Sequence, residues 1–206
     1  MPLYANVTKV NSFVGHLDCV YALSKAPEQN HFFSAAADGI IGLWNAETGS
    51  SVAAFLKTDA PLYSLKLSPD QKWLAAGRND GGVLIVEIEK KLLVKNAKVH
   101  DKAIFDLCFL RNQMLACASG DGSVSLWNTE TWKCESKLRL SEQSLRSIAL
   151  HPVSPILAVS GTDGYIRILD AFDFTVLNAW KASEQTIFKL RFSPDGNQLL
   201  SAGKNA

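Results

Sequence analysis

The chain has 206 residues, of which 47% are apolar and 20% charged, and its formal net charge is +1. This composition is typical of a globular protein with enough chain to bury a substantial core. The sequence has no basic tract, no apolar run of about 18 residues and no N-terminal pattern of a secretory signal. We therefore expect no nucleic-acid binding, no membrane span and no signal peptide.

The cysteines predict neither a metal site nor a disulfide framework. They are Cys19, Cys108, Cys117 and Cys134. None forms a C-x-x-C pair, and their spacing fits no zinc motif. We expect reduced, mostly buried thiols in a cytoplasmic protein, with the nucleus as the alternative compartment if the source is eukaryotic.

A repeat of about 42 residues runs along the chain. Asp-Gly pairs begin at Asp38, Asp80, Asp121 and Asp163, at intervals of 42, 41 and 42 residues. Asp-Gly favours two-residue turns because both residues tolerate a positive φ. Each pair lies between two short apolar runs, as in "FFSAAADGIIGLWN" (32–45), which predicts a β-hairpin.

A further strand is predicted before each hairpin and a weaker one after it. The preceding strands are expected at 20–25, 62–67, 104–109, 145–150 and 187–192. The following strands are expected at 51–56, 91–96, 134–140 and 175–180. Repeated units of four antiparallel strands, with no helical period, predict an all-β propeller.

Two of the units carry a motif that resembles the WD40 repeat. His16, Asp38 and Trp44 have the spacing of that motif, and His100, Asp121 and Trp127 repeat it. The resemblance covers essentially the whole chain and implies a single WD40 β-propeller domain, 1–206, of four-stranded antiparallel blades. The blades are expected at 17–57, 58–97, 98–140, 141–182 and, incomplete, 183–206.

The resemblance also predicts a truncated ring. WD40 propellers commonly have seven blades and close by pairing the first with the last. Residues 5–16 match an outer strand that would close the last blade, so 1–16 are expected to be a closing strand and lead-in. Ser201 and Asn205 match the hydroxyl and turn positions of a fifth repeat. We therefore expect about five of seven blades, in a C-terminally truncated fragment whose open ends make it associate.

In the family, four side chains of a blade form a hydrogen-bonded tetrad. The first unit has a full set: His16, Ser34, Asp38 and Trp44. The third has His100, Asp121 and Trp127, with Cys117 at the hydroxyl position. The second and fourth keep only Asp80 and Asp163, so we expect these blades to rely on apolar packing and to be locally less rigid.

The sequence predicts no catalysis. Ser34, His16 and Asp38 are residue types of a nucleophilic triad, but the tetrad accounts for their spacing. "SGDGS" (119–123) lacks the helix of a phosphate site, and His31 and His151 lie in or beside turns with no partner at metal-ligand spacing. We expect a non-enzyme with no cofactor, no metal and no small-molecule substrate.

The resemblance implies a scaffold that binds a peptide or loop of a protein partner on the top face, around the central channel. One class of contact positions gives Tyr21, Tyr63, Phe105, Arg146 and Phe188. The residues just before the first strands are Cys19, Pro61, Ala103, Ser144 and Thr186. The residues just before the turn aspartate positions are Ala37, Asn79, Gly120, Thr162 and Lys204. Of these, Asn79, Thr162 and Lys204 are candidates for binding the partner.

Two questions stay open at this point. The aromatic ring either contacts the partner or fills the centre of the propeller, and Arg146 is the best single candidate for binding an acidic group. The alternative function is a platform in an RNA- or chromatin-associated assembly with direct nucleic-acid contact, which the net charge disfavours.

Overall fold

The computed structural model describes residues 8–111 and 113–204. Residues 5–7 of the expected closing strand and Asn205, expected at a turn position, lie outside the described residues. Within the described part of the chain the regular elements are β-strands, β1 to β18, and none is a helix. They form four antiparallel sheets of four strands and one sheet of two. The predicted all-β fold of four-stranded antiparallel blades is confirmed.

Each four-stranded sheet uses consecutive strands. The first contains β1 (Val20–Lys25), β2 (His31–Ala36), β3 (Ile40–Asn45) and β4 (Ser51–Lys57). The second contains β5 (Leu62–Leu67), β6 (Trp73–Arg78), β7 (Gly82–Glu87) and β8 (Leu92–Lys98). We call these sheets blades one and two.

The remaining blades follow the same order. Blade three contains β9 (Ile104–Phe109), β10 (Met114–Ser119), β11 (Ser123–Asn128) and β12 (Lys133–Arg139). Blade four contains β13 (Leu145–Leu150), β14 (Ile156–Gly161), β15 (Tyr165–Asp170) and β16 (Val176–Lys181). Blade five pairs β17 (Ile187–Phe192) with β18 (Leu199–Gly203).

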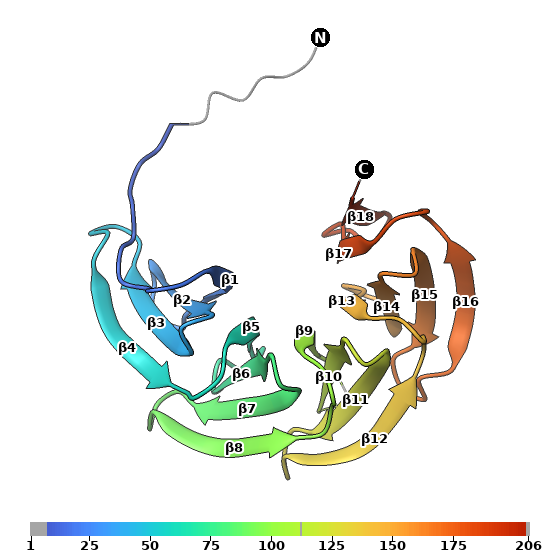
Figure 1. Cartoon of the computed structure of the whole chain (residues 1–206), viewed down its shortest axis with the longest axis horizontal. Helices are drawn as coiled ribbons and strands as arrows, with labels where there is room; N and C mark the ends of the chain where they lie inside the picture. The colour runs from blue at the N-terminus through green and yellow to red at the C-terminus, as the bar shows by residue number, and fades with distance from the viewer. Residues whose placement is uncertain (1–7, 112, 205–206) are drawn as a thin grey trace.

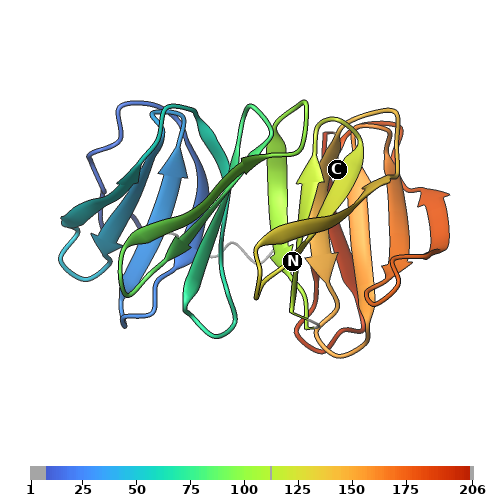
Figure 2. The ribbon, with the colours of Figure 1, turned by 90° about the horizontal axis from the view of Figure 1, so that it is seen from below.

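The blades are arranged radially in an arc (Figure 1). The first strand of each blade, β1, β5, β9, β13 and β17, lies at the centre, and the fourth strands, β4, β8, β12 and β16, lie on the outside. Seen from the side, the blades stand next to one another with their loops at two opposite ends (Figure 2). This arrangement brings the inner strands together around one channel.

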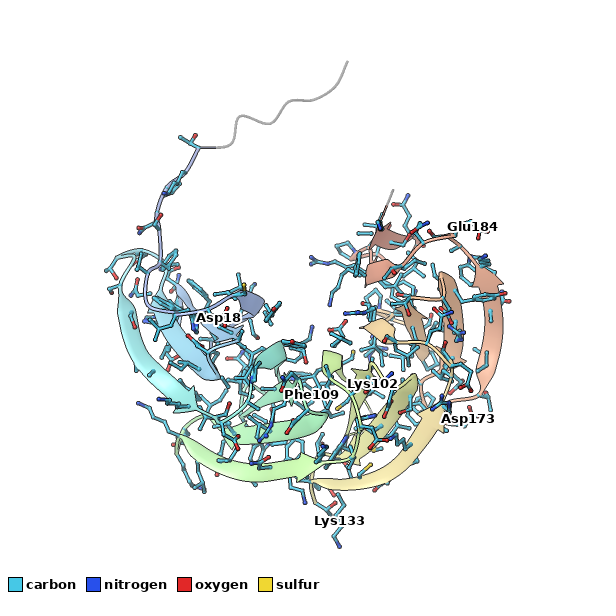
Figure 3. All side chains as sticks on the ribbon, viewed as in Figure 1. Asp18, Lys102, Phe109, Lys133, Asp173 and Glu184 are labelled. Carbon is cyan, nitrogen blue, oxygen red and sulfur yellow. The ribbon has the colours of Figure 1, made fainter. Side chains whose placement is uncertain are left out.

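The core lies between neighbouring blades, where side chains fill the space between the sheets (Figure 3). In blade two, Leu74 and Leu84 pack against blade one, whereas Ala75 and Ile85 pack against blade three. Successive side chains of a strand point to opposite faces of its sheet. Because both faces are covered, β6 and β7 are almost wholly buried, and the first five residues of each are apolar without alternation.

The Asp-Gly turns require glycine for two reasons. Gly122 has φ +87°, a left-handed conformation that L side chains rarely adopt. In addition, a Cβ on Gly122 would lie 2.0 Å from the backbone oxygen of Ser141, in the loop leading to blade four. Each hairpin turn is therefore packed against the start of the next repeat.

The segment expected to be a closing outer strand forms no strand over residues 8–16. A strand needs a neighbour for its backbone hydrogen bonds, and this segment pairs with none of the described strands. It runs beside blade one, where the Phe13 ring meets the rings of Phe32 and Trp44 at centroid distances of 5.0 and 5.9 Å.

None of the four cysteines is in a disulfide. Cys108 and Cys117 are buried in the cores, Cys134 is half-buried and Cys19 is exposed. Burial raises the pKa of the Cys108 thiol to about 11, so this thiol stays neutral at physiological pH.

Candidate functional site

The tetrad of blade one forms a continuous chain of hydrogen bonds. Trp44 Nε1 lies 2.7 Å from Ser34 Oγ, which lies 2.6 Å from His16 Nε2. His16 Nδ1 lies 2.9 Å from Asp38 Oδ2. One assignment of protons gives every group a partner: the indole N–H donates to Ser34, the Ser34 hydroxyl donates to His16, and the other imidazole nitrogen donates to Asp38.

This chain is a structural element rather than a nucleophilic triad. Ser34 is buried, and its oxygen already accepts the indole N–H of Trp44. Asp38 accepts the backbone N–H groups of Leu17 and Ile40 as well as the imidazole N–H of His16. Burial alone would raise the pKa of Asp38, but these hydrogen bonds outweigh burial and lower it below its ordinary value. The carboxylate is ionised and ties the turn to the start of the blade.

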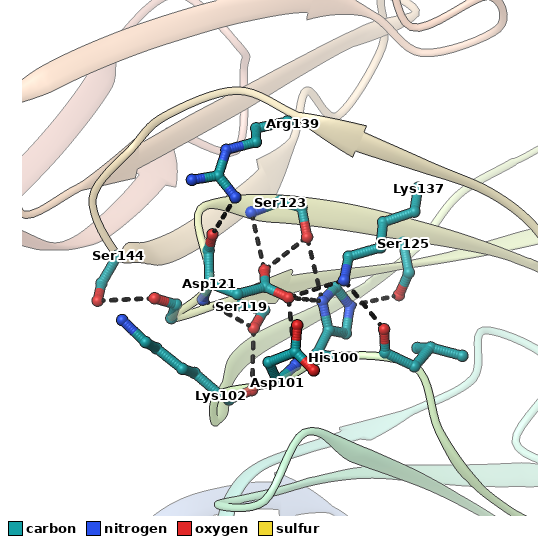
Figure 4. A network of polar contacts seen from close by, with 12 residues as sticks. His100, Asp101, Lys102, Ser119, Asp121, Ser123, Ser125, Lys137, Arg139 and Ser144 are labelled. Atoms are coloured by element: carbon teal, nitrogen blue, oxygen red, sulfur yellow. Dashed lines mark hydrogen bonds and ion pairs between the residues drawn. The ribbon is translucent and has the colours of Figure 1, made fainter.

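Blade three has a complete tetrad as well, because Ser125 supplies the hydroxyl. Figure 4 shows Ser125 and Asp121 on either side of the His100 ring. Ser125 Oγ lies 2.8 Å from His100 Nε2 and 2.9 Å from Trp127 Nε1. The expectation that Cys117 leaves this blade without a hydroxyl is therefore wrong. Ser125 pairs with Cys117 across β10 and β11, just as Gly42 pairs with Ser34 across β2 and β3.

The turn carboxylate of blade three has further partners. Asp121 accepts hydrogen bonds from Ser123 and His100 and lies 2.9 Å from Lys137 Nζ. Burial would raise the pKa of Asp121, but the bonds from Ser123, Lys137 and His100 hold it well below its usual range. Burial lowers the pKa of His100 by more than Asp121 raises it, so the imidazole is neutral near pH 7.

Arginines replace the histidine in blades two and four. Arg78 donates to both carboxylate oxygens of Asp80, at 3.0 and 2.7 Å. Arg167 Nη2 lies 2.6 Å from Asp163 Oδ2, which also accepts the Ser141 hydroxyl at 2.7 Å. The expectation that these blades rely on apolar packing alone is wrong, because an arginine can neutralise the turn aspartate from within the same hairpin. Their lower rigidity stays a prediction.

Four of the five candidate contact residues of the inner strands form a stack. The Tyr21 ring meets Tyr63 edge-on at 4.6 Å, and Tyr63 is stacked with Phe105 at 5.7 Å between centroids. Arg146 Cζ lies 3.8 Å above the Phe105 ring, a cation–π contact. We call Tyr21, Tyr63, Phe105, Arg146 and Phe188 the channel rim. Tyr21 and Phe188, at its two ends, are 53% and 51% exposed, so the rim is both packed and accessible.

Arg146 is a cation without a counter-charge among the described residues. Its Nε atom is buried and has no hydrogen-bond partner there. No carboxylate of the described chain lies within 4.0 Å of its guanidinium nitrogens. Burial lowers the pKa of Arg146, although the group stays protonated at physiological pH. A charge held in this way favours a bound anion.

The other two classes of candidate positions are joined by backbone hydrogen bonds. In every blade, the residue before the turn aspartate position donates its N–H to the carbonyl of the residue before the first strand. The pairs are Ala37 with Cys19, Asn79 with Pro61, Gly120 with Ala103, Thr162 with Ser144 and Lys204 with Thr186, at 2.8 to 3.0 Å. Both classes thus lie at the end of the inner strands where the rim residues begin.

Below the rim, the inner strands line a channel with a volume of about 1120 Å³, which is open on the side between β1 and β17 (Figure 1). The rim residues and further side chains of β1, β5, β9, β13 and β17 line it. In the described part of the chain no group of three or more His, Cys, Asp or Glu side chains is placed to hold a metal ion. Those same residues include no helix of the length and apolarity that crossing a bilayer requires.

The two turn histidines bind backbone atoms. His31 Nδ1 lies 2.8 Å from the carbonyl oxygen of Gln29. His151 Nε2 lies 3.0 Å from the carbonyl of Gly196, while its Nδ1 accepts the amide of Ser154 at 2.8 Å. Both side chains stabilise loops.

Radial four-stranded blades with His-Ser-Trp-Asp tetrads define a WD-repeat propeller fold. The family model of the WD40 repeat (WD domain, G-beta repeat) matches residues 7–45, 49–86, 92–128 and 132–170. These matches cover most of the chain, which therefore belongs to the WD40 repeat family.

The chain is similar to WD-repeat and other proteins whose names describe different roles. The chain is 28% identical to a WD repeat-containing protein 91 homolog of Dictyostelium discoideum over 84% of its own length. It is 26% identical to mouse pre-mRNA-processing factor 17 over 98%, and 25% identical to autophagy-related protein 16 of Arabidopsis thaliana over 95%. It spans only 23%, 37% and 39% of these relatives, respectively.

Proposed function

We propose that the chain is a non-catalytic protein-interaction scaffold whose channel rim binds a peptide or loop of a partner protein. A carboxylate of that partner binds Arg146. The observation that carries this proposal is the guanidinium of Arg146, which is stacked on Phe105, partly desolvated and without a counter-charge among the described residues.

The chemistry of the rim supports a protein partner. Tyrosine, phenylalanine and arginine are enriched in protein interfaces, and hot spots concentrate on aromatic residues and arginine. Four rim side chains contact one another before any partner arrives, which reduces the side-chain entropy lost on binding; they are Tyr21, Tyr63, Phe105 and Arg146. The membership in the WD40 family supports the general role of scaffold, whereas the partner itself is a matter for experiment.

The test is a selection of random displayed peptides on the full chain. We expect enriched peptides to carry Asp, Glu or a free C-terminal carboxylate, and to bind Arg146→Ala about 10-fold more weakly, which corresponds to the loss of one charge-assisted contact of about 1.4 kcal/mol. Arg146→Lys keeps the charge and should bind more tightly than Arg146→Ala. The control is Lys133→Ala, on the exposed outer strand of blade three.

The melting temperature of Arg146→Ala should stay within a few degrees of the parent chain, because the lost cation–π contact, about 1–2 kcal/mol for a partly desolvated pair, is offset in part by removing a buried cation that has no counter-charge among the described residues. Enriched peptides that bind Arg146→Ala as well as the parent chain would rule out the proposed site.

The alternative is a platform in an RNA- or chromatin-associated assembly that contacts nucleic acid directly. In its favour, one relative is named pre-mRNA-processing factor 17. Against it, single-stranded nucleic acid binds by stacking its bases on exposed aromatic faces. The Tyr63 and Phe105 faces are covered by each other and by Arg146, so the largely exposed rings of the rim are Tyr21 and Phe188, at its two opposite ends. We therefore favour the protein partner.

A further inference from the structure

The channel below the rim is strongly cationic in a chain that is nearly neutral overall. Its wall carries five basic side chains, Lys25, Lys66, Arg146, Lys189 and Arg191, against one carboxylate, Asp106. The whole chain has 21 basic and 20 acidic residues. Basic groups are thus concentrated on the surfaces that face the channel.

The single carboxylate of the wall, that of Asp106, already has hydrogen-bond and ion-pair partners within the protein. Asp106 Oδ2 accepts the Ser147 hydroxyl at 2.9 Å and the Ile148 amide at 3.0 Å, both from blade four. It also lies 2.7 Å from Lys189 Nζ, of blade five. Asp106 thus links the inner strands of three blades and neutralises one lysine.

The other four cations have no such partner. No carboxylate among the described residues lies within 4.0 Å of the charged nitrogens of Lys25, Lys66, Arg146 or Arg191. Like charges lining one concave wall repel each other and raise the local potential, which attracts anions. The wall is therefore complementary to several negative charges rather than to one.

The cations lie at different depths. Arg146 is the second residue of its inner strand, and Lys66 and Arg191 are the fifth residues of theirs. With a rise of about 3.3 Å per residue, the fifth position is about 10 Å further along the strand than the second. Lys25 is the last residue of β1. Charges spread along the channel suit an extended chain better than a compact anion.

We propose that the partner inserts an acidic polypeptide segment into the channel. Its carboxylates bind Arg146 at the rim and Lys66 and Arg191 further in. This inference rests on the proposed function, to which it adds the depth of the contact and the need for several acidic residues. The channel volume of about 1120 Å³ leaves room for such a segment.

The test uses fluorescein-labelled decaglutamate and the full chain, with binding measured by fluorescence anisotropy at pH 7 and at several salt concentrations. A ten-residue Gly-Ser peptide with one central Glu probes the rim alone. We expect decaglutamate to bind more tightly than the single-Glu peptide, and K66Q/R191Q to weaken decaglutamate about 10-fold while leaving the single-Glu peptide unchanged. The matched control is K57Q/K133Q, which removes two exposed charges from outer strands.

The other outcomes distinguish the channel proposal from the rim proposal. If Arg146→Ala weakens both peptides but K66Q/R191Q weakens neither, the rim function stands and the channel proposal falls. If none of the three variants changes binding, both proposals fall. An equal loss in K57Q/K133Q would reveal non-specific attraction and overturn the inference. Tighter binding of fluorescein-labelled decauridylate than of decaglutamate, lost in K66Q/R191Q, would overturn it in favour of nucleic acid.

Discussion

A hydroxyl at the centre of a tetrad can come from either of two neighbouring strands. Ser34 of β2 and Ser125 of β11 make the same pair of hydrogen bonds, to an imidazole and to an indole. Opposite Ser34 stands Gly42, where a Cβ would lie 2.8 Å from Trp44 Nε1 and 3.0 Å from Ser34 Oγ. The strand opposite the hydroxyl therefore leaves little room next to the indole, and in blade one this position of β3 is a glycine.

We predict that Ser125→Ala lowers the free energy of unfolding by about 1–3 kcal/mol, because it leaves the buried N–H of Trp127 and one nitrogen of His100 without their partner. Urea denaturation measures this change. The control, Ser51→Ala on the exposed outer strand of blade one, should cost less than about 0.5 kcal/mol.

A second variant tests whether the hydroxyl can change strands. The double variant C117S/S125G reproduces the arrangement of blade one and should recover part of the stability lost in Ser125→Ala. A double variant that is less stable than Ser125→Ala would show that the two strands are not interchangeable.

Acid should destabilise the chain in two stages. The pKa of His100 is lowered in the folded state. Its contribution to stability is therefore present above about pH 6.5 and is lost as the pH falls below that value. The pKa values of Asp38, Asp80, Asp121 and Asp163 are also lowered, so their contributions are lost below about pH 4.

We therefore predict that the urea midpoint falls modestly from pH 7 to 5 and steeply below pH 4. His100→Gln should flatten the first stage and leave the second. Stability that rises between pH 7 and 5 would contradict the assignment of a neutral imidazole.

At the level of the elements, the sequence predicts the inner strands best. The five predicted first strands have the bounds of β1, β5, β9, β13 and β17. Predicted fourth strands differ from β4, β8, β12 and β16 by up to two residues at an end. The inner strands of blades two to four are largely buried, and all five recur at regular spacing between turns, whereas outer strands are mostly exposed and have a weaker apolar pattern.

The sequence predicts the polar site less well, because side-chain partners depend on strand register. The sequence does not point to Ser125, because the motif places the hydroxyl on the second strand. Even so, "GSVSLWN" has Ser125 where "GIIGLWN" has Gly42, which is one of three differences between the two segments. Arg78 and Arg167 lie two residues before and four residues after their aspartates, on different strands. An Asp-Gly turn without a histidine, but with an arginine close by, is the signal that would have found them.

The Arg78–Asp80 pair should hold the hairpin of blade two together. Arg78 is buried, so Arg78→Ala leaves the Asp80 carboxylate without its bidentate donor and should cost about 1–3 kcal/mol. Amide hydrogen exchange should become faster in β6 and β7 and stay unchanged in blade four. Arg139→Ala, which breaks an exposed pair with Glu142, is the control and should cost less than about 1 kcal/mol.

The same exchange experiment on the parent chain tests the predicted difference in rigidity. Blades two and four should exchange faster than blades one and three, which contain the tetrads. Equal protection in all four would mean that an arginine pair stabilises a hairpin as well as a tetrad does.

At the scale of the whole molecule, the two end blades expose apolar side chains. Val20 and Leu23 of β1 are 48% and 66% exposed, and Leu200 of β18 is 57% exposed. Exposed apolar side chains that gather on one surface favour association. We predict concentration-dependent self-association in sedimentation velocity, reduced in L23S/L200S and unchanged in Val153→Ser, which removes an exposed apolar group from a loop. A single monomeric boundary at all concentrations would contradict this.

The cores between consecutive blades also have a consequence for biosynthesis. Each core is made by segments about 40 residues apart in the chain, and none needs a distant part of the sequence. Proteins built in this way gain stability one neighbour at a time. A blade can dock on its predecessor as soon as its strands leave the ribosome, so the arc can grow during translation, at about 5–20 residues per second, without waiting for the rest of the chain.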